Sequence, residues 1–279
     1  MSQLVIRQLL IDLKTPFALR WNGGDAFTSA FMNALSMSFP VGEQFFLDAV
    51  REGLKQLPIE QQNHHKDEVK GFVGQEATHR KLHSLYNQHL MAQGMVNHWE
   101  KRALKRIAIM QTLDIRHSVA ATAATEHYTA VFAHWLLANP SFLAHADERL
   151  KTLWLWHASE ESEHRCTAFD VYKALQGNEE WRLRWMRLIT WYLLTDLLRQ
   201  TINNLWHDGS LFKLSTWVSG WRLLLSPQGL LRGNYRAWKD YFAADFHPSQ
   251  HDASLSTQWL ATHTSDYTVV RAAGKPVAA

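Results

Sequence analysis

The fold is decided by the stretch Trp156-His157-Ala158-Ser159-Glu160-Glu161-Ser162-Glu163-His164-Arg165. Three of its side chains, those of His157, Glu161 and His164, are spaced four and three residues apart. Each residue of a helix turns by about 100°, so these side chains fall within an arc of roughly 60° on one face. The spacing therefore predicts a metal-binding helix face, which needs a second face opposite to it.

A second stretch, Gln75-Glu76-Ala77-Thr78-His79-Arg80-Lys81-Leu82-His83, is expected to provide that face. Its Glu76 and His79 repeat the Glu-x-x-His spacing of the first stretch. His83 follows one helical turn later and adds a further nitrogen on the same side. The two stretches together predict two facing helices that both carry metal ligands.

Two further glutamates complete a repeated order along the chain. Glu43 lies 33 residues before Glu76, and Glu126 lies 35 residues before Glu161. Two Glu-x-x-His copies, with one Glu from each of two other helices, are the pattern of a di-metal carboxylate four-helix bundle. A single Glu-x-x-His usually lies on a solvated face. The doubled order instead predicts two helix pairs joined by a crossover, with a site for two metal ions between them.

Composition bounds the remaining possibilities. The 279 residues are 46% hydrophobic and 20% charged, which indicates one large globular domain or a domain with an appendage. The net charge of +3 gives no overall signature of nucleic-acid binding. The one cysteine, Cys166, excludes an internal disulfide framework and fits a reducing compartment. The N-terminus has no signal-peptide pattern, and no apolar run approaches the ~20 residues of a membrane span, so a cytoplasmic protein is expected.

Breaker residues divide the chain into expected segments. An irregular or partly extended leader is expected over 1–24 and a tail over 251–279, which is polar and expected to be poorly ordered after about Ser254. Periodicity predicts bundle helices over 25–57, 60–93, 119–138 and 144–176, within a bundle domain spanning 25–177. A short basic amphipathic helix is expected in the crossover at 95–115, and two or three helices in a C-terminal appendage at 178–250.

Single residues refine these helices. Pro40 is expected to kink the first helix or to start a new one. Gly71 and Gly74 precede Glu76, and glycine inside a helix predicts close approach of a neighbouring helix or a ligand. Ser118 is expected to cap the third bundle helix.

The appendage is rich in tryptophan and basic residues. Residues 181–239 hold seven of the thirteen Trp and nine Lys or Arg against two acids. One interpretation is a helical cap that buries its Trp against the bundle. The other is contact with something apolar and anionic, either a lipid-like substrate or a membrane surface to which the protein is peripheral.

Several motifs resemble one bacterial family. They are Phe-Pro-Val-Gly-Glu-Gln-Phe-Phe at 39–46, Gln-Glu-Ala-Thr-His at 75–79, Glu-His-Tyr-Thr at 126–129, His-Ala-Ser-Glu-Glu-Ser-Glu-His-Arg at 157–165 and Phe-His-Pro at 246–248. These motifs resemble the family catalogued as predicted metal-dependent hydrolases, over roughly residues 20–250. The resemblance implies an all-α, ferritin-like four-helix bundle with additional C-terminal helices, and its name implies hydrolysis.

A narrower resemblance concerns one motif. His-x-x-x-Glu-x-x-His, here His157, Glu161 and His164, is similar to the arrangement in p-aminobenzoate N-oxygenases, where an additional histidine joins the ferritin-type ligands. The rest of the chain does not match those enzymes, so their substrate class is not implied.

The family pattern implies a set of six metal ligands. Glu76 and Glu161 would bridge two ions, Glu43 and Glu126 would be terminal, and His79 and His164 would complete the set. Carboxylate and imidazole ligands without a thiolate favour iron, with manganese or zinc as alternatives. His157 and His83 are expected either as additional ligands or as histidines that orient a carboxylate.

Two polar residues adjoin the expected ligands, and three functions are compatible with the ligand set. Glu160 and His127 adjoin ligands but lie about 100° around the helix, which predicts polar contacts behind the site. Three functions fit: a di-iron enzyme that oxidises a small organic or lipid-like substrate with O2 and an electron donor, a di-metal hydrolase that activates a bridging water, and a non-catalytic metal-binding bundle. The first is favoured, and the oligomeric state stays open.

Overall fold

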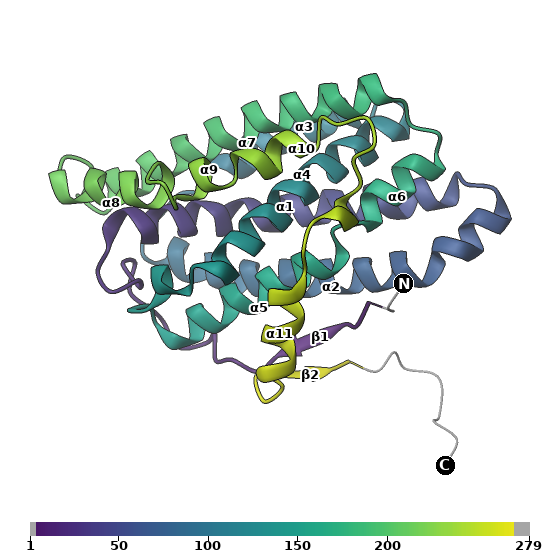
Figure 1. Ribbon diagram of the computed structural model, residues 1–279. Helices are drawn as coiled ribbons and strands as arrows, with labels where there is room; N and C mark the ends of the chain where they lie inside the picture. Colours follow the sequence, from purple (N-terminus) through teal and green to yellow (C-terminus); the bar gives the residue numbers. More distant parts are fainter. Residues whose placement is uncertain (1–3, 271–279) are drawn as a thin grey trace, which may run out of the picture.

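Four helices form the bundle that surrounds the site (Figure 1). The structure is a computed structural model that describes residues 4–270. The four helices are α1 (Ala26–Lys55), α2 (Ile59–Ala92), α4 (Ile115–Ala138) and α5 (Glu148–His164). Helix α1 packs against α2 and α4, and α4 packs against α5. The prediction of an all-α bundle is confirmed.

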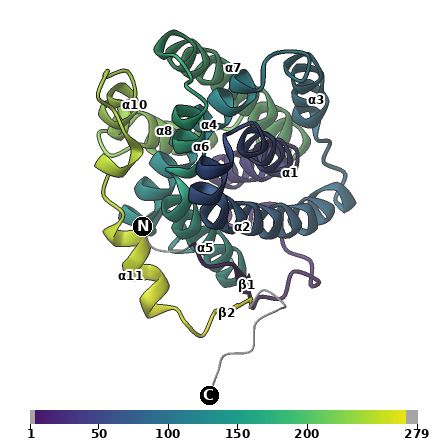
Figure 2. The same cartoon turned by 90° about the vertical axis from the view of Figure 1, so that its right-hand side faces the viewer.

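The remaining elements cover this bundle. Helix α3 (His98–Met110) lies in the crossover, as expected, and contacts α1 and the long helix α7 (Glu179–His207). Figure 2 shows α3 and α7 at the upper side of the bundle and α11 on the opposite side. The other elements are α6 (Thr167–Ala174), α8 (Leu214–Leu224), α9 (Leu230–Gly233), α10 (Tyr235–Asp240), α11 (Ser254–Thr262), the 3-10 turns η1 (Pro140–Leu143) and η2 (Pro248–Gln250), and the strands β1 (Arg7–Leu9) and β2 (Tyr267–Val269).

Asparagine and aspartate side chains begin most of the long helices. Each accepts a hydrogen bond from a backbone N–H of the first turn, which satisfies a donor that has no partner inside the helix. Ser118, expected to begin the third bundle helix, instead lies buried within α4, because Asp114 provides the cap one turn earlier. The capping residues are Asp25, Asn97, Asp114, Asp147 and Asn178.

Helix α1 continues through Pro40 instead of starting anew there. Proline has no N–H, so the carbonyl oxygen of Ser36 loses its usual helical partner. The side-chain Nδ2 of Asn87, on α2, donates to that oxygen at 2.9 Å. A partner from the neighbouring helix therefore compensates for the missing hydrogen bond, and α1 needs no second start.

The expected helix over 144–176 is divided in two. Helix α5 ends at His164, and α6 begins at Thr167 after a turn at Arg165 and Cys166. The Arg165 guanidinium donates to the backbone carbonyls of Pro248 and His251, at 3.1 and 3.0 Å. The break thus lets an arginine beside the last ligand attach the segment that precedes α11.

The N-terminal segment is extended and lies against α2. Strand β1 pairs with β2 in an antiparallel ladder. A Cβ added at Gly71 would lie 2.5 Å from the Leu4 Cβ, and one added at Gly74 would lie 2.1 Å from the Ile6 Cδ1. The two glycines therefore serve close packing, as predicted, but the segment that approaches is this N-terminal strand and not a helix or a ligand.

The tail is more ordered than expected. Helix α11 packs against α5, buries Trp259 and Leu260, and donates a hydrogen bond from the Ser256 hydroxyl to the Ser159 carbonyl at 2.8 Å. These apolar residues stabilise a helix that the polar composition of the tail does not suggest. Residues 271–279 of the expected tail lie outside the described part of the chain.

The Trp-rich region forms α7 to α10, more helices than the two or three expected. Helix α7 packs along α1 and α4, which agrees with a cap over the bundle. Four of the Trp nevertheless remain exposed, namely Trp191, Trp206, Trp217 and Trp221. No helix within residues 4–270 is both long and apolar enough to span a bilayer.

Candidate metal centre

Seven of the eight predicted ligands meet in two adjoining groups inside the bundle. One group combines Glu43 of α1, His79 of α2 and His157 of α5, and the other combines Glu76, Glu126, Glu161 and His164. Within each group, one oxygen or nitrogen atom per residue lies within 4.8 Å of all the others. All seven side chains are buried. Helices α1, α2, α4 and α5 therefore each contribute to a shared centre, as the doubled spacing predicts.

Glu161 lies between the two groups. Its Oε1 is 2.7 Å from His157 Nε2 and 3.4 Å from His79 Nδ1. Its Oε2 faces His164 Nε2 at 3.5 Å. One carboxylate thus presents one oxygen to each group, which is the geometry that a bridging ligand requires.

The polar atoms at the centre lack hydrogen-bond partners. Within the described residues, both carboxylate oxygens of Glu43, Glu76 and Glu126 are buried without a hydrogen bond, and so are His79 Nδ1 and His164 Nε2. Buried polar groups are nearly always satisfied, so a cluster of orphaned acceptors points to a cation. The donor set of carboxylates and imidazoles fits iron, manganese or zinc.

Burial also shifts the protonation of the cluster. Burial raises the pKa of Glu43 and of Glu76, and it raises the pKa of Glu126 to about 8. Burial opposes a charge on His79, but the hydrogen bond to Glu160 and the nearby carboxylate of Glu161 outweigh it and raise the pKa of His79 to about 10. In the metal-free protein the cluster therefore retains protons at neutral pH, and metal ions would have to displace them.

The residue before each Glu-x-x-His glutamate orients the histidine of the opposite copy. Gln75 precedes Glu76, and its Oε1 lies 2.9 Å from His164 Nδ1. Glu160 precedes Glu161, and its Oε2 lies 2.9 Å from His79 Nε2. An oxygen acceptor on one ring nitrogen directs the other nitrogen into the centre. The expectation of a polar contact for Glu160 is confirmed.

Arg7 and the N-terminal strand hold both orienting residues. The Arg7 guanidinium donates to Glu160 Oε1 at 3.0 Å and to both oxygens of Glu163. Gln75 donates from its Nε2 to Glu163 Oε2 and to the Val5 carbonyl, both at 2.9 Å. These bonds identify the Gln75 oxygen as the atom that faces the histidine. The N-terminal strand therefore supports the centre from behind.

A chain of hydrogen bonds sets the tautomer of His157. Asn87 Nδ2 donates to the Ser36 carbonyl, so the Asn87 Oδ1 accepts from the Ser36 hydroxyl at 2.8 Å. The Ser36 oxygen then accepts from His83 Nδ1 at 2.9 Å. Burial holds the pKa of His83 well below its usual value, so His83 is neutral and its Nε2 accepts from His157 Nδ1 at 2.7 Å.

This hydrogen-bond chain determines which nitrogen of His157 carries the proton. Burial, together with the charge of His79, lowers the pKa of His157 to about 4, so its ring carries one proton at neutral pH. With that proton on Nδ1, the Nε2 lone pair faces Glu161 Oε1 at 2.7 Å and Glu43 Oε1 at 3.9 Å. A lone pair aimed at carboxylates is favourable only with a cation between them.

His83 and His127 both lie close to the ligands but outside the two groups. His83 belongs to neither group, because both of its nitrogens are engaged, so its geometry fits the orienting alternative. His127 points away and contacts the Ala237 carbonyl, which confirms a polar interior contact. Sequence reasoning missed Arg7, Gln75 and Asn87. Comparison of the two Glu-x-x-His copies could have found Gln75, whereas nothing in the sequence links Arg7 to residues more than 150 positions away.

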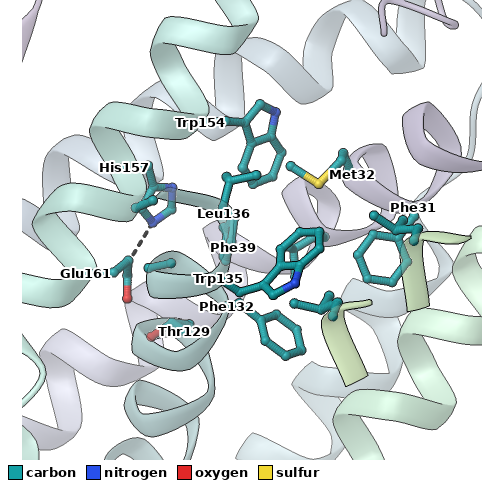
Figure 3. A pocket seen from close by; sticks show the side chains of 15 residues that line it. Phe31, Met32, Phe39, Thr129, Phe132, Trp135, Leu136, Trp154, His157 and Glu161 are labelled. Carbon is teal, nitrogen blue, oxygen red and sulfur yellow. Dashed lines mark hydrogen bonds and ion pairs between the residues drawn. The ribbon is translucent and has the colours of Figure 1, made fainter. Parts of the chain in front are cut away.

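An apolar cavity of about 60 Å³ adjoins the centre (Figure 3). His157 and Glu161 lie at one side of it, with a dashed line marking their 2.7 Å contact, and Phe39, Phe132 and Trp135 form much of the remaining wall. Among residues 4–270, Thr129 is the one polar residue besides the two ligands that lines it. The cavity therefore places a small apolar space directly beside two residues of the ligand cluster.

These features define a helical-bundle protein with a buried carboxylate–histidine centre suited to metal ions. Comparison with known families agrees, because the family model described as predicted metal-dependent hydrolase matches residues 5–252. The chain belongs to that family. No match was found among curated proteins or among solved structures. The ferritin-like placement and the likeness to N-oxygenases therefore stay predictions from sequence motifs.

Proposed function

We propose that the centre binds two metal ions. Glu43, His79 and His157 would hold one, and Glu76, Glu126 and His164 the other, with Glu161 between them. The family pattern implied Glu76 as a second bridge, whereas it lies in the group of Glu126, Glu161 and His164 and would hold one ion in this proposal. The orphaned, buried donor atoms of both groups support this arrangement. Four carboxylates supply four negative charges, which balance two divalent ions in a site that excludes water.

We further propose that the protein oxidises a small apolar or amphipathic molecule with O2. The observation that carries this proposal is the cavity beside His157 and Glu161, whose other lining residues are almost all apolar. Two iron ions would supply the reduction of O2. The chain's own residues would position a C–H-rich group against the centre and keep water away from it.

Aromatic residues of the cavity wall contact the ring of His157. The Phe39 ring lies 4.7 Å from the His157 ring, and Trp154 stacks parallel to the same ring at 6.4 Å between centroids. These contacts hold the imidazole in place on the cavity side. Since the Thr129 hydroxyl donates to the Glu126 carbonyl of its own helix, it offers no strong anchor to a polar substrate.

Hydrolysis is the second candidate, because the family description favours it. Two ions can lower the pKa of a bound water and stabilise developing negative charge. A hydrolase also needs to bind a polar ester, amide or phosphoester next to that water. Apart from the ligands, none of the described residues that line the cavity carries a charge. The N–H donors in the lining are the indoles of Trp135 and Trp154. The Trp135 indole already donates to the Gln228 carbonyl.

Anaerobic loading with Fe(II) followed by exposure to O2 tests the proposal. The expected result is rapid O2 consumption with a change in the visible or near-ultraviolet spectrum, both lost in Glu126→Ala. His64→Ala, which changes an exposed histidine of α2, is the matched control. An inert iron form, together with turnover of esters or phosphoesters by the Zn(II) or Mn(II) form, would establish hydrolysis instead.

A further inference from the structure

A second and larger cavity lies behind the first. Its volume is about 250 Å³, and it is lined by residues of α1, α3, α4 and α7. The two cavities share Leu35, Phe39, Thr129 and Phe132 as lining residues. These side chains are the partition between the larger cavity and the one that reaches the metal centre. The two cavities therefore adjoin each other, and the larger one extends to α3 and α7.

The larger cavity is apolar along its length. Four of its hydroxyl groups are already engaged: Ser38, Thr125 and Thr129 donate to carbonyls of their own helices, and Tyr128 donates to Thr190 Oγ1 at 2.7 Å. The rest of the lining is mainly Phe, Leu, Ile, Val, Met and Trp. A ligand chain there would gain from burial of its apolar surface and would find few free polar partners.

One charged residue, Arg106, lines the larger cavity. Its guanidinium lies over the Tyr192 ring at 4.3 Å and donates to the buried carboxylate of Asp196. Arg102 also donates to Asp196, and Arg199 lies 3.6 Å from it. Three guanidinium groups thus share one carboxylate, which leaves an excess of positive charge at this end of the cavity. The Arg102 Nη2 is moreover buried without a hydrogen-bond partner.

We propose that this cavity binds an amphipathic molecule with an apolar chain and one anionic end. The anionic end would pair with Arg106 and its neighbouring arginines, and the chain would extend past Phe39 toward His157 and Glu161. The inference that the far end of this chain is the reacting group rests on the proposed function. Binding itself does not, because no residue of the larger cavity belongs to the ligand groups.

Titration with dodecanoate, followed by calorimetry, tests this site in the metal-free and the iron-loaded protein. Ala103 lines the cavity, and Ala108 is exposed on the same helix, so Ala103→Phe and Ala108→Phe are a matched pair. We expect Ala103→Phe to weaken binding by about tenfold or more and Ala108→Phe to leave it unchanged. Equal binding by both variants would overturn the site.

The head group is tested without any substitution. Dodecanol and dodecylammonium should bind at least about tenfold more weakly than dodecanoate, because they lack the charge that pairs with Arg106. Equal binding of the three would overturn the anionic end. If the protein binds dodecanoate but neither holds iron nor consumes O2, the proposed function is refuted and the binding site stands. If the protein binds iron and consumes O2 but does not bind dodecanoate, the binding site is refuted and the proposed function stands.

An independent observation concerns the outer surface of α7 and α8. Trp191 and Trp206 of α7 are 65% and 64% exposed, and Phe212 and Leu214, in and after the connecting loop, are 85% and 80% exposed. The Trp206 and Phe212 rings lie 6.0 Å apart. Figure 1 places α8 at one end of the molecule, where α7 also ends. Trp206, Phe212 and Leu214 gather at the connection between α7 and α8, and Trp191 lies about 22 Å further along α7. Large exposed apolar groups of this kind mark an interaction surface.

The charge of this surface indicates its partner. Arg187, Lys213 and Arg222 lie on the same elements, and both acids of the region are already paired. Asp196 is buried among arginines, and Asp208 binds Arg20 at 2.8 Å. Aromatic residues next to unpaired cations suit the interface of an anionic bilayer. We propose that the surface formed by Trp191, Trp206, Phe212, Leu214 and Trp221 docks on anionic lipid.

Vesicle co-sedimentation at low salt tests the surface. Vesicles of equal parts phosphatidylglycerol and phosphatidylcholine should bind the protein, and vesicles of phosphatidylcholine alone should bind it weakly. Replacement of Trp206, Phe212 and Leu214 by Ser should abolish binding. The control replaces three exposed apolar residues elsewhere, Ile59, Met91 and Val96, by Ser. Equal loss of vesicle binding in both triple variants would overturn the lipid assignment. So would a dimer of the wild-type protein that the Trp206, Phe212 and Leu214 substitutions dissociate and the control substitutions do not.

Discussion

Replacement of Asn87 by leucine tests the hydrogen-bond chain that connects Pro40 to His157. Leucine is close to asparagine in size and Asn87 is buried, so the main loss is two hydrogen bonds and not a large cavity. The Ser36 carbonyl then has no donor, because residue 40 is proline. An orphaned buried carbonyl costs about 1–3 kcal/mol. We expect the free energy of unfolding of the metal-free protein to fall by about 2 kcal/mol, within that range.

The same substitution should change the tautomer of His157. Without Asn87, the Ser36 hydroxyl can donate to His83 Nδ1, and His83 then carries its proton on Nε2. His157 Nδ1 would accept from it, and its own proton would move to Nε2, where it faces Glu161. Loss of the Nε2 lone pair from the centre should weaken metal binding by about 10–100-fold, as other losses of orienting groups do.

Urea unfolding in the presence of a chelator measures the first effect, and competition with a chromophoric chelator measures the second. Asn63→Leu, at an exposed position of the same helix, is the control. Pro40→Ala restores an N–H that can bond the Ser36 carbonyl, so the double variant should regain stability without regaining metal affinity. If Asn87→Leu matches Asn63→Leu in stability and in metal affinity, the hydrogen-bond chain has no such role.

Three further predictions concern protons, orientation and the N-terminal strand. The raised pKa values of Glu126, about 8, and His79, about 10, mean that the metal-free protein gains stability from their bound protons at low pH and loses it as the pH rises through these values. Stability in urea unfolding should therefore decline from about pH 4.5 to 8 through Glu126 and from about pH 6.5 to 10 through His79, with no further loss from these groups at higher pH. Calorimetry in two buffers should show proton release on metal binding. Glu160→Gln keeps a hydrogen-bond partner for His79 but removes its charge, so metal affinity should fall about tenfold in the chelator assay. Gly71→Ala should displace Leu4, which lies 2.5 Å from the added Cβ, and speed amide hydrogen exchange in β1; unchanged exchange would contradict the packing role.

The sequence predicted the bundle and the ligand groups because both depend on local spacing. Glu-x-x-His places its two side chains on one helix face whatever the partner is, and the repeated order along the chain identifies the facing helices. The Asp114 cap and the break at Arg165 were missed for a different reason. Several residues could cap or interrupt those helices, and tertiary contacts, such as Arg165 with the Pro248 carbonyl, decide among them.

The supporting residues depend on contacts across long sequence separations. Arg7 reaches Glu160, and no periodicity relates these two positions. Asn87 corrects a backbone defect that Pro40 creates on another helix, so its role becomes visible only when the two helices are seen side by side. The polar tail was expected to lack order because its composition is polar, yet Trp259 and Leu260 provide enough apolar contact to hold α11 against α5.

Metal content per chain tests the central claim most directly. Protein should be saturated in turn with Fe(II), Mn(II) and Zn(II), freed of loosely bound metal by gel filtration, and analysed by mass spectrometry. The wild-type chain should retain two ions of at least one of these metals, and His64→Ala should retain the same number. Glu161→Ala should fall to one or fewer, because Glu161 faces both groups. Two ions retained in Glu161→Ala, or none in the wild type with any of the three metals, would contradict the assignment.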